Sequence, residues 1–216
     1  MASALTAPVA SLLATPTSRL PYQHNVLLRT YLLRRDQGNA LIYNSPGIAE
    51  AAEAIAQFGG ADRLLINHAH EGMYGSPAID VPVFVHERDR AGLGDSVRIA
   101  GTFTRRTKID DDLEVLPTPG HTAGTTSYLW DSGVHRFLFT GDFIWLEHGE
   151  WKAVVLDERL RESYLQSLAL VRDLDFDVLV PWGATDDGPP ISETTPPSTR
   201  RRVGTIITRL ENGESR

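Results

Sequence analysis

Short apolar runs separated by turn signals dominate the chain, and they predict strands. Two such runs, residues 27–34 and 39–43, flank a polar, Gly-containing turn at residues 36–38 and predict a β-hairpin. Buried strands are also predicted at residues 64–67, 82–86 and 177–181. Further short, β-branched or aromatic runs predict antiparallel strands at residues 97–107, 113–118, 125–130 and 135–140, with a weaker strand pattern at 151–155.

Three segments instead carry apolar residues at helical spacing. The spacing predicts helices over residues 48–58 and within residues 156–174. A final helix is expected to end at Leu210, with Ser198 or Thr199 as its N-terminal cap. Between these elements we expect a helical turn at residues 87–93 and a Pro- and Gly-rich loop at residues 186–197.

The order of the elements predicts an α/β (α+β) fold. Strands, helix, strands, helix, strand and helix suggest two sheets with helices outside them, rather than strict βαβ alternation. We expect a single domain over residues 23–216, because no linker and no repeat divides it. Residues 1–22 are expected to form an N-terminal arm or a leading strand. They contain no Lys or Arg before Arg19, so the positive start of a signal peptide is missing.

Composition narrows the classes of function. The net charge is −7, which disfavours nucleic acid as a partner because phosphate binding needs a basic face. No apolar run approaches the roughly 20 residues that span a bilayer, so we expect no membrane partner and a cytoplasmic location by default. The chain has no cysteine, which excludes thiolate ligands, iron–sulfur clusters and a Cys nucleophile. Any metal must therefore be bound by His, Asp or Glu.

Polar residues at the ends of predicted strands are the candidates for chemistry. His68 and His70 follow the strand at residues 64–67, and alternate side chains of an extended segment face the same way. His121 follows another strand in a Pro-Gly turn, with Gly124 allowing close backbone approach. Asp142 ends a third strand. Each residue alone has an ordinary explanation as a turn or cap residue, but together they predict a metal site.

The motifs His68-Ala69-His70, Pro119-Gly120-His121 and Gly141-Asp142, in this order, resemble the metallo-β-lactamase fold superfamily. The resemblance runs from about residue 25 to residue 181 and implies a four-layer αββα sandwich with a metal site between the sheet edges. It matches His68, His70 and His121 to a three-His site and Asp142 to a metal-bridging carboxylate.

The sequence departs from the family where a second metal would be bound. The family loop reads HxHxDH, but its Asp falls on Gly72 and its last His on Met73. Residues 181–184 lack the final His, and the early Asp of the family falls on Tyr43 or Asn44. The first metal position is therefore complete, whereas the second is depleted. Asp186 or Asp187 could supply a substitute carboxylate.

Three neutral imidazoles with one open position form the ligand set of a catalytic zinc, which lowers the pKa of its water toward roughly 7. We expect one zinc or iron ion, with Asp142 as ligand or water-orienting catalytic group. Glu71 is a second catalytic candidate, although a solvated loop carboxylate would also explain it. Tyr74, Trp145 and Trp182 could form an apolar wall for a substrate.

The expected activity is mononuclear hydrolysis of a small ester, thioester or lactone. The first alternative is a catalytically inactive descendant with the same fold that has lost most of the metal ligands of the family. In it the metal is lost or structural, and the protein serves for binding or as a structural protein. A second is an oxidoreductase that uses a His and carboxylate iron site. A small-molecule substrate is the expected partner, and a homodimer is left open.

Overall fold

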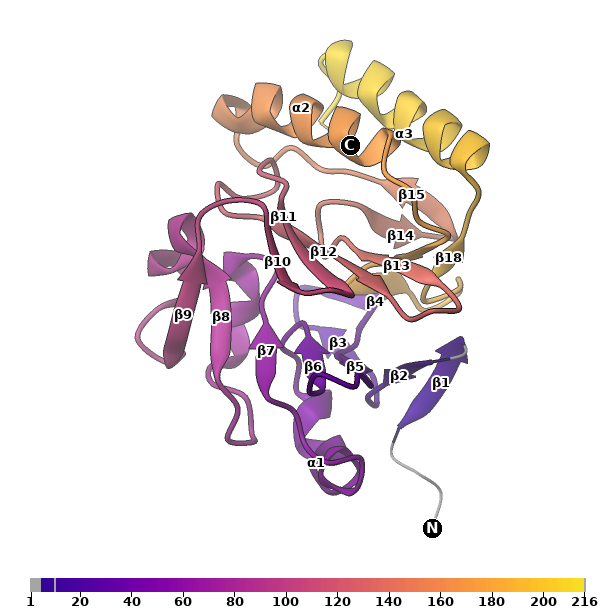
Figure 1. The fold of residues 1–216 in the computed structure, drawn as a ribbon. Coiled ribbons are helices and arrows are strands. Elements are labelled where there is room, and N and C mark those ends of the chain that lie inside the picture. Colours follow the sequence, from indigo (N-terminus) through magenta and orange to yellow (C-terminus); the bar gives the residue numbers. More distant parts are fainter. Residues whose placement is uncertain (1–4, 10, 216) are drawn as a thin grey trace.

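The computed structural model describes residues 5–9 and 11–215 and has the predicted four-layer αββα architecture (Figure 1). The helix α1 (Gly47–Gln57) covers one outer face, and α2 (Arg161–Arg172) and α3 (Pro196–Glu211) cover the opposite one. Four short 3-10 helices lie in the connections: η1 (Ala69–Tyr74), η2 (Glu87–Asp89), η3 (Ala91–Leu93) and η4 (Glu158–Leu160).

The sheet nearer α1 has seven strands in the order β1-β2-β5-β6-β7-β8-β9. β5 and β6 form the predicted antiparallel hairpin, whereas β6 to β9 run parallel to one another. The bounds are β1 (Thr6–Val9), β2 (Leu12–Ala14), β5 (Tyr31–Leu33), β6 (Ala40–Ile42), β7 (Arg63–Leu65), β8 (Val83–His86) and β9 (Ile99–Phe103).

The layer nearer α2 and α3 consists of a six-stranded and a five-stranded sheet. The six strands, in spatial order, are β10 (Thr107–Asp110), β11 (Leu113–Pro117), β12 (Thr126–Asp131), β13 (Arg136–Phe139), β16 (Val178–Val180) and β18 (Ser192–Glu193). The five strands are β15 (Glu150–Lys152), β14 (Trp145–Glu147), β17 (Gly183–Thr185), β4 (Gln23–Leu28) and β3 (Ser18–Leu20).

Three apolar cores fill the spaces between the four layers. The period-2 alternation of the strands divides their side chains between these cores. In β5, Tyr31 and Leu33 face the central core between the sheets, whereas Leu32 faces the core against α1. β16 alternates in the same way between the central core and the core beneath α2 and α3. Buried strands of this kind read as continuous apolar runs, which is why their positions were predictable.

The predicted strand at residues 27–34 is wrong in one respect, because it is two strands in different sheets. β4 pairs with β17 and β5 pairs with β2 and β6. At the break, the Arg29 amide donates to the Trp182 carbonyl and the Thr30 amide donates to the Thr15 hydroxyl. These partners come from distant parts of the chain, so tertiary contacts move the strand from one sheet to the other.

Three smaller expectations also need correction. The N-terminal cap of α3 is Thr195, whose hydroxyl accepts from the Ser198 amide, because Pro at the first helical positions lets the helix begin earlier. β9 runs parallel to β8 rather than antiparallel. The segment expected to be a loop after residue 186 contains the short strand β18.

The N-terminal residues contribute strands to both strand layers. β1 and β2 extend the seven-stranded sheet, and β3 pairs with β4. Residues 1–4 and 10 lie outside the described part of the chain, and a boundary between an arm and a domain at residue 22 stays a prediction. Among the described residues, no helix has the length and apolar character needed to cross a membrane.

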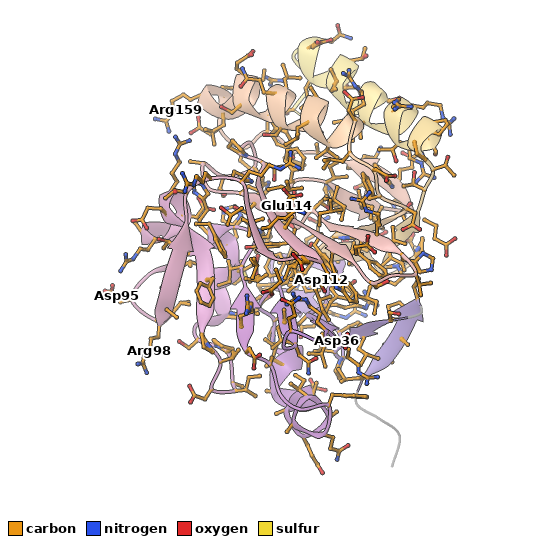
Figure 2. The ribbon with its side chains drawn as sticks, in the orientation of Figure 1. Asp36, Asp95, Arg98, Asp112, Glu114 and Arg159 are labelled. Carbon is orange, nitrogen blue, oxygen red and sulfur yellow. The ribbon has the colours of Figure 1, made fainter. Side chains whose placement is uncertain are left out.

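A buried arginine joins the strand layers. The Arg35 side chain is fully buried and donates to Asp110 at 2.6 Å and to Asp112 at 2.5 Å. In the view of Figure 2, Asp112 lies near the centre of the picture, whereas Asp95, Arg98 and Arg159 lie at the edge of the molecule. The charged pair therefore connects the end of β5 with the turn between β10 and β11.

Candidate metal centre

Four side chains from three separate segments meet at the sheet edges. His68, His70, His121 and Asp142 each offer one ligating atom, and these atoms all lie within 4.8 Å of one another. Asp142 Oδ2 lies 3.4 Å from His68 Nε2 and 3.7 Å from His121 Nε2, and His70 Nδ1 lies 3.1 Å from His121 Nε2. Tetrahedral coordination at about 2.0–2.1 Å requires ligand atoms about 3.3–3.4 Å apart, so the spacing suits one ion.

The three imidazole rings radiate from a common centre. Their centroids are 4.9–5.0 Å apart and their planes cross at 84–87°. The expected reason for this proximity, strand alternation, is wrong. β7 ends at Leu65, His68 is extended, and His70 lies within the 3-10 helix η1. The tight turn of η1, rather than a strand, brings the two side chains to the same point.

Asn67 orients His68. The Asn67 amide nitrogen donates to the carbonyls of Thr126 and Thr140, which fixes its oxygen 2.9 Å from His68 Nδ1. In the neutral ring that a metal ion would bind, Nδ1–H donates to this oxygen, and Nε2 carries the lone pair and faces Asp142. Nε2 is buried and has no hydrogen-bond partner among the described residues. A buried acceptor without a donor is costly, and a metal ion would satisfy it. The residues present therefore fit a metal ion.

Charge at the cluster also favours a cation. Burial by itself lowers the pKa of His68, but the carboxylates of Asp142 and Glu71 outweigh burial and raise this pKa to about 10. Burial and the neighbouring positive His68 lower the pKa of His121 to about 3, and the same two causes lower that of His70. Burial raises the pKa of Asp142, but the charge on His68 outweighs it and lowers this pKa. A positive charge is therefore stabilised between His68 and Asp142.

Gly141 lets Asp142 approach the histidines. Its φ is 57°, in the left-handed region that favours glycine. A Cβ atom there would lie 1.9 Å from the Asn67 amide oxygen. The backbone of Gly141, after β13, therefore packs directly against the side chain of Asn67, after β7.

Glu71 is not the solvated carboxylate that one interpretation of the sequence predicted. It is fully buried and accepts hydrogen bonds from the amides of Asn44 at 2.7 Å, Asn67 at 2.7 Å and His68 at 3.2 Å. Its oxygen lies 3.5 Å from Nδ1 of His68, whereas Asp142 lies beside Nε2. Glu71 is thus on the opposite side of the ring from Asp142, and its catalytic role stays a prediction.

Asp89 is a site residue that the sequence did not single out. Its buried carboxylate accepts from the Ala69 amide at 2.9 Å and the Gly124 amide at 2.7 Å, and also from the Thr122 hydroxyl. A Cβ atom at Gly124 would lie 2.7 Å from Asp89, which explains the close approach that this glycine predicted. Asp89 therefore connects the loop of His70 with the loop of His121. The only signal in the sequence was a carboxylate within the predicted turn at residues 87–93.

Other side chains occupy the positions of the second metal. The Trp182 indole donates to the Asn44 carbonyl at 3.1 Å and packs edge-on against His68 at 5.3 Å between centroids. The Tyr43 hydroxyl donates to the Val180 carbonyl and accepts from the Gly141 amide. Met73 is 44% exposed. These positions now serve packing rather than coordination.

The suggested substitute carboxylates are engaged elsewhere. Asp186 pairs with Arg19 at 2.9 Å, and Asp187 pairs with His148 at 2.7 Å. Neither belongs to the cluster that the described residues form.

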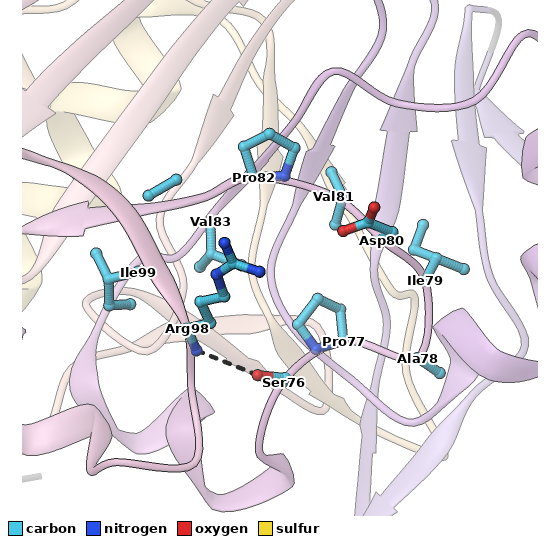
Figure 3. Close-up of a pocket in the computed structure, with 11 residues that line it drawn as sticks. Ser76, Pro77, Ala78, Ile79, Asp80, Val81, Pro82, Val83, Arg98 and Ile99 are labelled. Carbon is cyan, nitrogen blue, oxygen red and sulfur yellow. Dashed lines mark hydrogen bonds between the residues drawn. The ribbon is translucent and has the colours of Figure 1, made fainter.

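A cavity of about 240 Å³ opens beside His70, His121 and Asp142. The predicted wall residue Trp145 borders it, whereas Trp182 packs on His68 and Tyr74 packs on Trp182. A wider hollow of about 840 Å³ lies elsewhere, along residues 76–83, and a hydrogen bond from the Arg98 amide to Ser76 closes one end (Figure 3). No candidate ligand borders that hollow, so the smaller cavity is the candidate substrate site.

Fold and site together define a class of protein, and comparison with known proteins agrees. The sequence profile of the metallo-beta-lactamase superfamily matches residues 49–183, more than half of the chain. The chain belongs to the metallo-beta-lactamase superfamily. A comparison with curated protein sequences gave no match.

Solved structures share the fold at low sequence identity. The metallo-beta-lactamase from Pontibacter korlensis is similar with a TM-score of 0.67 at 18% identity, over 96% of this chain and 98% of that one. A metallo-beta-lactamase family protein from Thermus thermophilus gives 0.64 at 17% identity, over 95% and 81%. The subclass B3 metallo-beta-lactamase BJP-1 of Bradyrhizobium japonicum gives 0.61 at 14% identity, over 97% and 93%. At these identities the likeness shows the fold alone.

Proposed function

We propose that the protein is a mononuclear metal-dependent hydrolase that acts on a small ester, thioester or lactone. The observation that supports this most directly is the buried Nε2 of His68, which has no hydrogen-bond partner among the described residues and lies 3.4 Å from Asp142 Oδ2. Superfamily membership and the cluster of three His and one Asp support a metal ion at this point. Zinc suits three imidazoles with an open position, and iron is the alternative.

In this proposal His68, His70 and His121 hold the ion, and Asp142 is a fourth ligand or holds the water. When bound, the ion supplies the positive charge that lowers the pKa of a water to roughly 7, so that hydroxide is available at neutral pH. Asp142 Oδ2 would accept the proton of the water and orient the attack of its oxygen on the carbonyl carbon. As the acyl–oxygen or acyl–sulfur bond breaks, the departing oxygen or sulfur would take this proton back from Asp142. An ester or thioester would give a carboxylic acid and an alcohol or thiol, and a lactone would give a hydroxy acid.

Packing around the second position supports a single ion. A Cβ atom at Gly72 would lie 2.7–3.1 Å from backbone atoms of Leu93, so this position has no room for an aspartate. On the other side, the Trp182 ring packs against His68 in the region of the missing histidine. Because backbone and a large ring fill this space, we expect about one equivalent of metal per chain.

Metal content tests the proposal. Purified protein should contain about one equivalent of zinc or iron by elemental analysis, and His121→Ala should remove most of it because the variant loses a ligand atom. His135→Ala is the matched control, since His135 pairs with Asp177 outside the cluster and should leave the metal content unchanged. An unaltered metal content in His121→Ala would contradict the assignment.

Turnover separates a hydrolase from an inactive relative. A panel of esters, thioesters and lactones should be hydrolysed by the metal-loaded protein, and a chelator should abolish the activity. Folded protein that retains the metal but hydrolyses none of them would support the alternative of a binding or structural protein.

A further inference from the structure

The substrate cavity is apolar on both sides of the candidate ligands. One side is the β3–β4 hairpin with Leu20, Val26 and Leu28, and the other includes Trp145 and Val154. Its volume of about 240 Å³ is below the about 300–1,000 Å³ that is common for drug-sized ligands. Such a cavity suits a small aliphatic group next to the reacting carbonyl.

The mouth of the cavity is apolar as well. Leu156 is 58% exposed and Tyr22 is 67% exposed, and both border this cavity. They are two of only five large hydrophobic residues that the described chain leaves exposed. Exposed apolar side chains gathered at the entrance of a pocket are typical of a binding site for an apolar molecule.

No positive side chain of the described residues lines the cavity. Its lining includes Asp142, and its other polar members are Tyr22, Gln23 and two candidate histidine ligands, with no Lys or Arg. Arg19, which lies in the β3–β4 hairpin, does not line the cavity and donates instead to the His24 carbonyl and to Asp186. A carboxylate on the acyl chain would therefore lose its water without gaining a partner, which is strongly unfavourable.

We infer that the cavity accepts an uncharged aliphatic acyl group and excludes acyl groups that carry a carboxylate. Resting on the proposed hydrolase function, this defines the substrate as a small ester, thioester or lactone whose acyl group is neutral and aliphatic. Anionic acyl compounds, including β-lactams with their ring carboxylate, are expected to be poor substrates even though the similar solved structures are named metallo-beta-lactamases.

A pair of hydroxamates tests this without requiring turnover. Hexanohydroxamate and the monohydroxamate of adipic acid present the same metal-binding group on six-carbon chains, but only the second ends in a carboxylate. Titration calorimetry on the zinc-loaded protein should give a dissociation constant about 100-fold larger for the adipate compound, since its charge would be buried unpaired. Equal dissociation constants would overturn the inference.

A positive charge placed at the mouth of the cavity should weaken the preference for the neutral acyl group. Leu156→Arg puts a guanidinium beside the cavity at an exposed position, so the fold should tolerate it, and the 100-fold difference should fall to about 10-fold or less. Leu156→Gln, similar in size and uncharged, should retain the discrimination. If both variants discriminate as the natural protein does, the acyl chain does not enter this cavity and the inference fails.

Ester hydrolysis separates this inference from the proposed function. The para-nitrophenyl esters of hexanoate, monomethyl adipate and adipate should be turned over with kcat/KM highest for the two neutral compounds. Turnover of all three at equal rates would overturn the charge preference and leave the hydrolase standing. Hydroxamate discrimination without turnover of any ester would support the cavity's preference and contradict the hydrolase.

Discussion

At the scale of single residues, the site depends on contacts that the candidate ligands make behind their metal-facing atoms. Asn67 fixes the tautomer and direction of His68, and Gly141 leaves room for Asn67. Glu71 accepts three backbone amides and holds the start of η1 against Asn44 and Asn67. Partners of this kind commonly change metal affinity 10–100-fold when they are removed, although they touch no metal.

Two glycines at positive φ allow the cost of backbone strain to be measured apart from the cost of a steric overlap. Gly141 (φ 57°) and Gly133 (φ 79°) share a left-handed backbone, but a Cβ atom at Gly133 would meet nothing within 4 Å. Gly133→Ala should lower the free energy of unfolding by about 1 kcal/mol. Gly141→Ala should lower it by about 2 kcal/mol more, because its Cβ overlaps Asn67. Urea unfolding measures both values, and equal losses would show that the contact with Asn67 is unimportant.

At the scale of elements, strand ends and short turns deliver the ligands. His121 follows β11, Asp142 follows β13, and η1 presents His70, so the three elements must be held in register. The carboxylate at the end of η2, Asp89, performs this task by bonding to the loops of both His70 and His121. A shift of either loop would separate His70 Nδ1 from His121 Nε2, which lie 3.1 Å apart.

Replacing Asp89 should weaken metal binding without removing a ligand. In Asp89→Asn, one of the two acceptor oxygens becomes an amide that faces backbone donors, so zinc affinity should fall about 10–100-fold in a competition titration with a chelating dye. The visible spectrum of the cobalt-substituted variant should also change as the ligand geometry loosens. Asp95→Asn, at an exposed residue on the periphery (Figure 2), should leave both readouts unaltered. An unchanged cobalt spectrum in Asp89→Asn would mean that Asp89 only stabilises the fold.

The sequence predicted the elements that local patterns determine. It did not predict features that depend on contacts between residues far apart in the chain. Apolar runs and strand-end polar residues identified β7, β11, β13 and the four candidate ligands. The break between β4 and β5 depends on Thr15 and Trp182, which no local pattern connects to Arg29 and Thr30. Asp89 escaped prediction for the same reason, because its donors lie 20 and 35 residues away.

At the scale of the whole molecule, the two strand layers are held by the central apolar core and by the buried Arg35 with its two carboxylate partners. Arg35 extends from the seven-stranded sheet to Asp110 and Asp112 of the six-stranded sheet. Burial raises the pKa of Asp112, but the hydrogen bond and charge of Arg35 outweigh it, and the net shift is downward. Loss of the Asp112 carboxylate would leave the buried Arg35 guanidinium short of hydrogen-bond acceptors, which destabilises the fold.

The ion pair predicts how stability depends on pH. Because the folded-state pKa of Asp112 is lowered, its contribution to stability is complete above the ordinary value of 3.8 and is lost as the pH falls through the lower folded-state value. Asp112→Asn should therefore reduce the free energy of unfolding by about 1.5–3 kcal/mol at pH 7 and by much less below about pH 3. Denaturant titrations at both pH values measure this, with Asp36→Asn as the exposed control. A difference independent of pH would show that charge is not the cause.

The contact between Gly72 and the backbone of Leu93 has a consequence for the history of this chain. A side chain at position 72 would first require η3 to move away, and the missing histidine could return only where Trp182 now packs. No single substitution can therefore restore the second set of ligands without disturbing the fold, and intermediates would be less stable than either end point. New activities in this lineage should arise through the walls of the cavity rather than through its ligands.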